Sequence, residues 1–159
     1  MPARVETAVK IKAVPATSVS PKQLKEENVV TSILVVEDSW LTRRVICKIL
    51  RAEGYETWEA SCGPEALEIL SLAKDRTQTP NCMLLDLLMP EMEGREVLQA
   101  MREKGFKIPV IVITADIQST TRSECMELGA LAVIHKMPNS DELIGWIKKA
   151  LSASEESAP

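Results

Sequence analysis

Short runs of mostly apolar residues recur along this chain, and a segment with the apolar spacing of a helix follows each of them. Apolar runs bounded by turn residues predict strands buried on both faces, which is typical of parallel sheets covered by helices. The expected strands cover 32–37, 55–60, 82–88, 108–115 and 131–136. The expected helices cover 39–54, 63–75, 93–105, 118–130 and 139–151.

This alternation predicts an α/β fold, because strand–helix units pack side by side into one sheet. With five units, the common solution is a doubly wound, flavodoxin-like sheet of five parallel strands in the order 2-1-3-4-5, with five helices on its two faces. Length and composition agree with one such domain, since the chain has 159 residues, of which 45% are apolar.

The two ends of the chain lack this alternation. Residues 1–31 contain three prolines and no sustained helical stripe, so we expect a flexible extension. Within it, Ser20 and the proline after it match the cap and the first position of a helix, which predicts a short helix near 21–27. Residues 152–159 are polar with little to bury, and we expect a disordered tail there. The folded domain should therefore cover 32–151.

The charge balance and the hydropathy exclude several classes of protein. The formal net charge is −4 and the basic residues form no long run, which argues against a nucleic-acid partner. No apolar stretch reaches the roughly 20 residues that span a bilayer, and the N-terminus lacks the apolar core of a secretory signal. We therefore expect a cytoplasmic protein with neither nucleic-acid nor membrane partners.

Polar residues stand where the apolar strands end. They are Glu37, Asp38, Asp86, Thr114 and Lys136. A buried carboxylate is costly unless it is paired or bound to a metal, so an acid inside the run "CMLLDLL" needs a reason. Doubly wound sheets bind ligands beyond the carboxyl ends of the strands, where the strand order reverses, which here is between the first and third strands. These side chains should therefore meet at one edge of the sheet.

The charges at this edge indicate a chemistry. Three neighbouring carboxylates repel one another unless a cation joins them. Lys136 can neutralise one of them, and Mg²⁺ fits an open site with few carboxylates and a phosphate. A carboxylate there can act as a nucleophile toward phosphorus and form an aspartyl phosphate. The metal and Lys136 would stabilise the charge on the phosphoryl oxygens, and Thr114 would donate a hydrogen bond to them.

Five segments, in order along the chain, carry a resemblance to a known family. They are "VVEDS", "EASCGPEAL", "DLLMPEMEG", "VIVITA" and "GALAVIHK". Together they resemble the receiver domains of response regulators in two-component signalling, which are CheY-like, over about residues 32–151. The separations also fit, with 28 residues from Asp86 to Thr114 and 22 from Thr114 to Lys136.

The resemblance implies a magnesium site. Asp38 and Asp86 would bind Mg²⁺ directly, together with the backbone carbonyl of Leu88. Glu37 would hold a metal-bound water. The loop beside the site would take its shape from the proline and the glycine of "LLMPEMEG".

The resemblance further implies that Asp86 accepts a phosphoryl group from a histidine kinase or a phosphotransfer protein, within a two-component phosphorelay. Lys136 would contact the phosphoryl group, and Thr114 would move toward it. The chain would not otherwise be an enzyme, because it would catalyse only its own phosphorylation and dephosphorylation. Since no DNA-binding helix pair follows residue 151, we expect a stand-alone response regulator, monomeric or weakly dimeric, that signals through a downstream protein.

Three positions depart from the family pattern. Three positions before the lysine, where the family usually has an aromatic switch residue, this chain has Val133. Directly after the lysine, where the family usually has proline, it has Met137. A cis bond before Met137 would cost roughly 3 kcal/mol, so we expect a trans bond or a strained loop. Leu88 stands where polar residues are frequent, which predicts slow loss of the phosphoryl group. Val133 and Trp146 should belong to a surface for switching or partner binding, unless Trp146 packs against the N-terminal extension.

Other functions stay open at this point. A haloacid-dehalogenase-type phosphatase also forms an aspartyl phosphate, but it needs a second acid two residues after the nucleophile, where this chain has Leu88. A degenerate receiver would bind partners without being phosphorylated, although all the site residues are intact here. A receiver domain cut from a hybrid kinase is a further alternative.

Overall fold

A single parallel sheet forms the centre of the molecule in the computed structural model, which describes residues 29–76 and 78–156. The strands are β1 (Ser32–Val36), β2 (Glu56–Ala60), β3 (Cys82–Asp86), β4 (Val110–Thr114) and β5 (Ala132–His135). Their order is β2-β1-β3-β4-β5, and every neighbouring pair in it is parallel. The doubly wound order predicted from the sequence is therefore confirmed.

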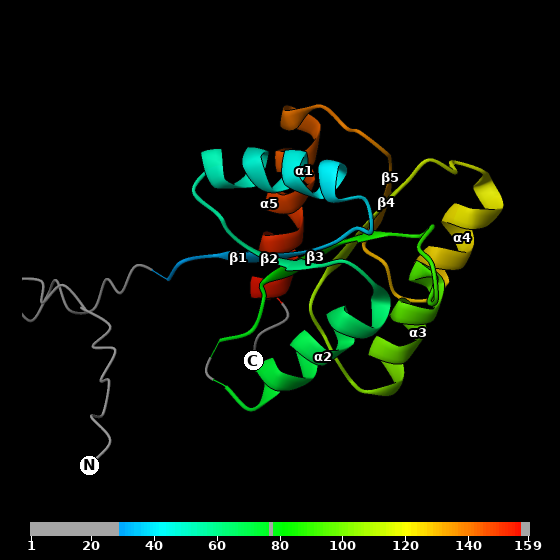
Figure 1. Ribbon diagram of the computed structural model, residues 1–159, viewed down its shortest axis with the longest axis horizontal. Coiled ribbons are helices and arrows are strands. Elements are labelled where there is room, and N and C mark those ends of the chain that lie inside the picture. The colour runs from blue at the N-terminus through cyan, green and yellow to red at the C-terminus, as the bar shows by residue number, and fades with distance from the viewer. Residues whose placement is uncertain (1–28, 77, 157–159) are drawn as a thin grey trace, which may run out of the picture.

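Helices cover both faces of this sheet (Figure 1). They are α1 (Trp40–Ala52), α2 (Gly63–Lys74), α3 (Gly94–Glu103), α4 (Ser119–Glu127) and α5 (Ser140–Glu156). On one face, Ile33 packs in a cluster with Leu50 of α1 and with α5. On the other face, Leu34 packs with Leu70 of α2, Leu98 of α3 and α4. Because successive strand residues point to opposite faces, the same apolar run fills both clusters.

Local signals in the sequence begin and end the helices. The Oγ of Ser39 accepts a hydrogen bond from the N–H of Thr42 at 3.3 Å and begins α1. The Oδ1 of Asn139 accepts one from the N–H of Glu142 at 2.8 Å and begins α5. Gly54 follows α1 with a φ of 89°, which side-chain-bearing residues rarely adopt. Because every neighbouring pair of strands is parallel, the carboxyl ends of the strands lie at one edge of the sheet.

The end of β3 differs from the prediction. The apolar run predicts a strand up to residue 88, but β3 ends at Asp86. The loop therefore takes the apolar residues after Asp86, and the acid ends its strand, as the sequence predicts for the polar residues at the strand ends. The short helix expected near 21–27 lies outside the described residues.

The carboxyl-terminal end of the chain also differs from the prediction. The sequence predicts a disordered tail from residue 152, but α5 continues to Glu156. Adding a residue to an existing helix costs far less than starting one, so the serine and alanine residues here can extend α5. The Oγ of Ser152 and that of Ser154 donate to helix carbonyls at 2.9 Å and 2.7 Å.

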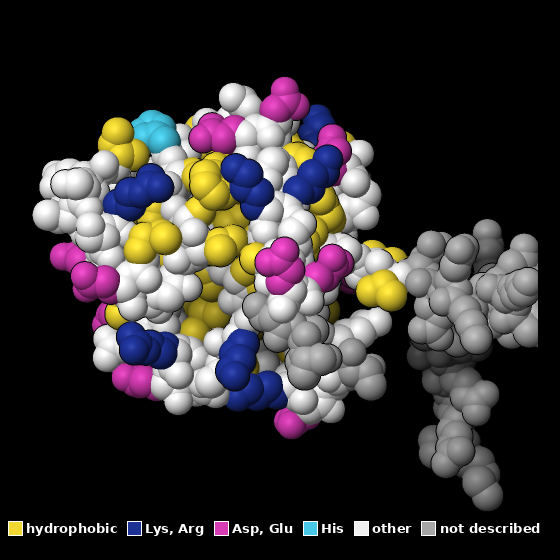
Figure 2. Space-filling model, turned by 180° about the vertical axis from the view of Figure 1, so that it is seen from behind, with side chains coloured by type: hydrophobic (Ala, Val, Ile, Leu, Met, Phe, Trp, Pro, Cys, Tyr) yellow, Lys and Arg dark blue, Asp and Glu magenta, His cyan; other side chains and the backbone are white. Residues whose placement is uncertain are grey.

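The described helices include none that is both long and apolar enough to cross a membrane. The surface carries charges of both signs, and Figure 2 shows apolar side chains in a hollow on the reverse side of the molecule. Several exposed large apolar side chains also follow the strand ends, close to the polar residues described next.

Candidate functional site

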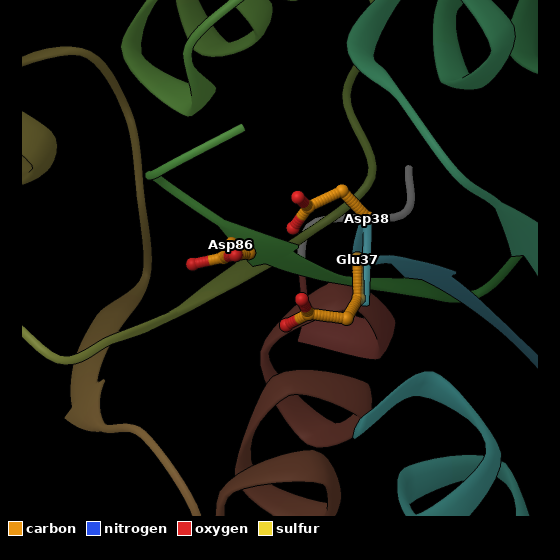
Figure 3. Close-up of side chains that lie close together, drawn as sticks. All are labelled: Glu37, Asp38 and Asp86. Carbon is orange, nitrogen blue, oxygen red and sulfur yellow. The ribbon is translucent and has the colours of Figure 1, made fainter. Parts of the chain in front are cut away.

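Three carboxylates meet at the carboxyl edge of the sheet, between β1 and β3. Glu37 and Asp38 follow β1, and Asp86 ends β3, which pairs with β1. One oxygen from each carboxylate lies within 4.8 Å of the other two. Figure 3 shows the side chains of Glu37 and Asp38 extending toward Asp86. The structure thus brings together the three acids that the sequence singles out.

Lys136, which follows β5, bridges two of these acids. Its Nζ lies 3.0 Å from Oε2 of Glu37 and 3.1 Å from Oδ2 of Asp86. Glu37 and Asp86 are only 2% and 3% exposed, so little water screens the attraction. Burial by itself lowers the pKa of Lys136, but the hydrogen bonds to both acids and the attraction of their charges together outweigh burial and raise the pKa above its usual value.

Glu37 is the most constrained of the three acids. Its Oε1 accepts a hydrogen bond from the N–H of Ser39 at 3.0 Å. Its backbone carbonyl accepts one from Nη1 of Arg43 at 2.7 Å. Burial raises the pKa of Glu37 above its usual value, while the N–H of Ser39 and the Nζ of Lys136 limit the rise. The negative charge of Glu37 therefore depends on the donors around it.

A close approach of two backbone segments supports Asp86. α3 begins at Gly94, whose N–H donates to the carbonyl of Leu87 at 2.9 Å. A Cβ at Gly94 would lie 2.5 Å from the backbone oxygen of Asp86 and 2.8 Å from the Cα of Leu87. Any side chain here would force the two segments apart, so glycine lets the start of α3 pack directly against the residue that carries the acid.

Thr114 lies at the same edge, fully buried at the end of β4. Ile113, the residue before it, is the register partner of Asp86. The Oγ1 of Thr114 accepts a hydrogen bond from the N–H of Asp116 at 3.1 Å. Its hydroxyl is therefore engaged with the loop between β4 and α4.

Met137 and Leu88 both lie in exposed loop positions around the site. Met137 has a φ of 62°, and the described part of the chain contains no cis peptide bond, so the bond before Met137 is trans. The left-handed backbone conformation is unfavourable for methionine. The departure at this position is thus accommodated by a trans bond in a strained loop, as the sequence predicts.

Val133 and Trp146 line one cavity of about 240 Å³, together with Ile117, Arg122 and His135 among others. Val133 is buried and Trp146 is half-buried. The Nη1 of Arg122 donates to the carbonyl of Val133 at 3.4 Å, which connects α4 to β5 beside this cavity.

The three acids fit a hard divalent cation. Oxygen ligands lie about 2.1 Å from Mg²⁺, so two on opposite sides of the ion are about 4.2 Å apart. The oxygens of the acids are already within 4.8 Å of one another, and small side-chain rotations would close the difference. Exposed Asp38 is free to turn toward an ion. Both oxygens of Glu37 are engaged by Lys136 and the N–H of Ser39, which favours an indirect role for Glu37.

The sequence does not predict a set of hydrogen-bonded residues that connects the β4–α4 loop to α3 and α4. Thr121 donates from Oγ1 to Oδ2 of Asp116 at 2.7 Å. Arg95 donates from Nη2 to Oγ1 of Thr121 at 3.3 Å. The available signal was weak: an aspartate two residues after Thr114, followed by serine and threonine residues that suit a helix start.

Comparison with known proteins agrees with this geometry. The family model of the response regulator receiver domain matches residues 33–148. Sporulation initiation phosphotransferase F of Bacillus subtilis (strain 168) is 36% identical over 119 residues, which cover 75% of this chain and 92% of the relative. Transcriptional regulatory protein SrrA of Staphylococcus aureus is 37% identical over 123 residues, which cover 77% of this chain but only 48% of SrrA.

Among solved structures, the response regulator TrrA of Thermotoga maritima in complex with Mg²⁺-BeF is similar, with 34% identity and a TM-score of 0.65 over 77% of this chain and all of that one. The chain therefore shares its fold and about a third of its sequence with this receiver-domain structure. The chain belongs to the response regulator receiver domain family of two-component signalling.

Proposed function

We propose that Asp86 accepts a phosphoryl group and that the chain is the phosphoacceptor of a two-component phosphorelay. The observation that carries the proposal is the bridge in which the ammonium of Lys136 lies within 3.1 Å of both Glu37 and Asp86. A fixed positive charge beside a nucleophilic carboxylate stabilises negative charge that is added there. The B. subtilis relative, which is named a phosphotransferase, and the T. maritima complex with Mg²⁺-BeF support the same reading.

The proposed step is a displacement at phosphorus. An oxygen of Asp86 attacks the phosphorus of a phosphohistidine on the donor protein, and an O–P bond forms as the N–P bond breaks. The imidazole leaves with the electron pair and takes up a proton. Lys136 donates to the phosphoryl oxygens, and the hydroxyl of Thr114 becomes a second donor when it turns toward Asp86.

We propose that Asp38, Asp86 and the backbone carbonyl of Leu88 hold Mg²⁺, with Glu37 acting through a bound water. When bound, the ion neutralises charge on the acids and on the phosphoryl oxygens. The Nζ of Lys136 contacts Oδ2 of Asp86, which leaves Oδ1 for the ion. The carboxylate of Asp38 is exposed, so it can reach an ion from the solvent side.

Large apolar side chains around the acids suit a docking protein. Trp40, Leu88, Ile117 and Met137 are exposed, and each follows the carboxyl end of a different strand. Exposed apolar groups gathered around a polar centre mark protein contacts. We propose that the histidine kinase or phosphotransfer protein binds on this rim and excludes water from Asp86 during the transfer.

The cavity lined by Val133 and Trp146 is the proposed contact for a downstream protein. The Nζ of Lys149 lies 4.4 Å from the centre of the Trp146 ring, so an aromatic surface and a positive charge stand together there. Val133 of β5 lies three residues before Lys136, so this contact can respond to a change at the acidic site.

Intact mass after incubation with acetyl phosphate and Mg²⁺ tests the phosphoacceptor. The wild type should gain one phosphoryl group, Asp86→Asn should gain none, and a chelator should abolish the gain. Asp141→Asn, which changes an exposed acid of α5, is the matched control and should behave as the wild type. Equal labelling of the wild type and Asp86→Asn would contradict the assignment of Asp86. No labelling of the wild type would favour a degenerate receiver that works by binding alone.

The lifetime of the phosphoryl group tests the role of Leu88. Its side chain is 61% exposed beside the acid, where an apolar group gives an attacking water no hydrogen bond. Leu88→Asn should shorten the lifetime about tenfold, which corresponds to ~1.4 kcal/mol of activation free energy. Leu72→Asn, at an exposed leucine of α2, is the control. An unchanged decay rate in Leu88→Asn would remove this role.

A further inference from the structure

One carboxylate, that of Asp116, holds the loop between β4 and α4. The backbone N–H of Asp116 donates to Oγ1 of Thr114 at 3.1 Å. The Oδ1 of its carboxylate accepts from the N–H of Gln118 at 3.0 Å. Its Oδ2 accepts from Oγ1 of Thr121, a buried residue in the first turn of α4, at 2.7 Å. The hydrogen bonds from Thr121 and Gln118 lower the pKa of Asp116, which keeps it charged near neutral pH. Asp116 thus joins the hydroxyl of Thr114 to α4.

Arg95 links Thr121 to α3. Its Nη2 donates to Oγ1 of Thr121 at 3.3 Å, and its Nε lies 2.9 Å from Oε2 of Glu124, which is also on α4. The Thr121 hydroxyl therefore accepts from one helix while it donates to the loop, as a hydroxyl group can.

These links close a ring around the proposed phosphoacceptor. Arg95 follows Gly94, whose N–H is bonded to the carbonyl of Leu87, the residue after Asp86. From Asp86 the ring runs through α3 to Thr121 and returns through the β4–α4 loop to β4, which pairs with β3. The ring thus includes both the acid and Thr114, which follows the register partner of Asp86.

A phosphoryl group on Asp86 would add negative oxygens next to Thr114. The Thr114 hydroxyl is a neutral donor at the neighbouring strand end, and turning toward those oxygens moves it away from its present place. Because a hydroxyl can accept one hydrogen bond while it donates another, the N–H of Asp116 can stay bonded and follow it. The carboxylate of Asp116 would then carry Thr121 along.

We propose that Asp116 and Thr121 are positioning residues that convert a movement of the Thr114 hydroxyl into a displacement of α4. The inference rests on the proposed role of Asp86. It gives a chain with Val133, in place of an aromatic residue, another way to report phosphorylation. α4 reaches β5 through the hydrogen bond from Arg122 to the backbone carbonyl of Val133, which needs no particular side chain at that position.

Hydrogen–deuterium exchange of the full chain, with and without beryllofluoride and Mg²⁺, tests the proposal. Fluorine NMR reports formation of the beryllofluoride adduct independently. In the wild type, exchange over Ser119–Glu127 should change about fivefold on adduct formation, which is the effect of one hydrogen bond. In Thr121→Val the adduct should still form, with an affinity within about twofold of the wild type, and the change in α4 should be lost.

Three further variants sharpen the test. Thr120→Val, at the exposed neighbouring threonine of α4, is the matched control and should respond as the wild type. Asp116→Ala should lose the α4 response, and Asp116→Asn, which keeps an acceptor oxygen for Thr121 but loses the one for the N–H of Gln118, should recover part of it. This rescue distinguishes positioning from general damage to the loop.

The outcomes separate the inference from the proposed function. A wild-type α4 response in Thr121→Val or Asp116→Ala would overturn the inference, as would an adduct in the wild type that leaves α4 unchanged. Either result leaves Asp86 as the phosphoacceptor. Loss of the adduct in Thr121→Val, in a protein that melts like the wild type, would also overturn it by making Thr121 part of the binding site. Absence of an adduct in the wild type would remove both claims.

Discussion

α3 and α4 are neighbours on the same face of the sheet, but they are held there by different forces (Figure 1). α3 buries Val97, Leu98 and Met101, and its first residue lies against the backbone of Asp86. α4 buries only two residues, Thr121 and Cys125, and has almost no apolar stripe. Apolar burial fixes α3, whereas directional polar links fix α4.

The difference shows how one fold can keep its site rigid and its output adjustable. Apolar burial is non-directional, so a new charge at Asp86 changes it little. Hydrogen bonds weaken steeply when their geometry changes, so α4 responds to small movements of the groups that hold it. The helix that supports the acid is therefore the stable one, and the helix next to it can report the state of the acid.

Large-to-small substitutions in the two helices should give the largest contrast. Leu98→Ala removes a buried side chain of α3 and should lower the free energy of unfolding by about 3 kcal/mol. Cys125→Ala, at a fully buried residue of α4, should cost about 1 kcal/mol. Urea denaturation measures both. Equal losses from the two substitutions would break the distinction between the helices.

The glycine at the start of α3 should give the next largest effect. Gly94→Ala places a Cβ 2.5 Å from the backbone oxygen of Asp86, so the loop must shift, and we expect a loss of about 2 kcal/mol together with weaker Mg²⁺ binding. Gly145→Ala in α5 is the matched control, because no atom lies within 4 Å of a Cβ there. The control should stabilise the protein by up to about 1 kcal/mol through helix propensity. Unchanged stability and Mg²⁺ affinity in Gly94→Ala would show that α3 does not support the acid.

The same contrast explains what the sequence could predict. Apolar periodicity marks buried strands and α3 directly, so the strand order and the meeting of Glu37, Asp86 and Lys136 followed from the pattern of strand ends. The sequence predicts a helix over 118–130, but it does not predict the polar partners of α4, because hydrogen bonds between Asp116 and Thr121 have no periodic signal. The last turns of α5 were missed for a related reason: polar composition alone does not decide between a tail and a helix already begun.

Removing Arg95 should loosen α4 with little effect on the whole fold. Arg95→Met keeps an apolar stem but removes the hydrogen bond to Thr121 and the ion pair with Glu124. Because these groups are partly exposed, we expect the free energy of unfolding to fall by less than about 1 kcal/mol. Hydrogen exchange should nevertheless become faster in α4 and stay unchanged in α3. A matched rise in both helices would mean that Arg95 stabilises the face as a unit.

Acid titration should give the smallest effect and the finest test. The hydrogen bonds from Thr121 and Gln118 hold the pKa of Asp116 below its ordinary value of about 3.9. A carboxyl group with a lowered pKa contributes stability above its ordinary pKa and loses that contribution as the pH falls through the folded value. The hydrogen bonds at the start of α4 should therefore weaken below about pH 4, while the apolar contacts of α3 hold.

Carbon NMR of the Asp116 carboxyl group, with amide shifts of both helices, follows this titration. Thr121→Val should move the midpoint of Asp116 upward, toward its ordinary pKa, because the largest contribution to the lowered value is lost. Thr120→Val should leave the midpoint in place. Glu65 of α2 is an internal reference: its pKa is lowered by hydrogen bonds from Ser61, which has no link to α4, so neither substitution should affect it. If Asp116 titrates at its ordinary pKa in the wild type, its carboxylate does not hold α4. That result would contradict the claim that polar links fix this helix.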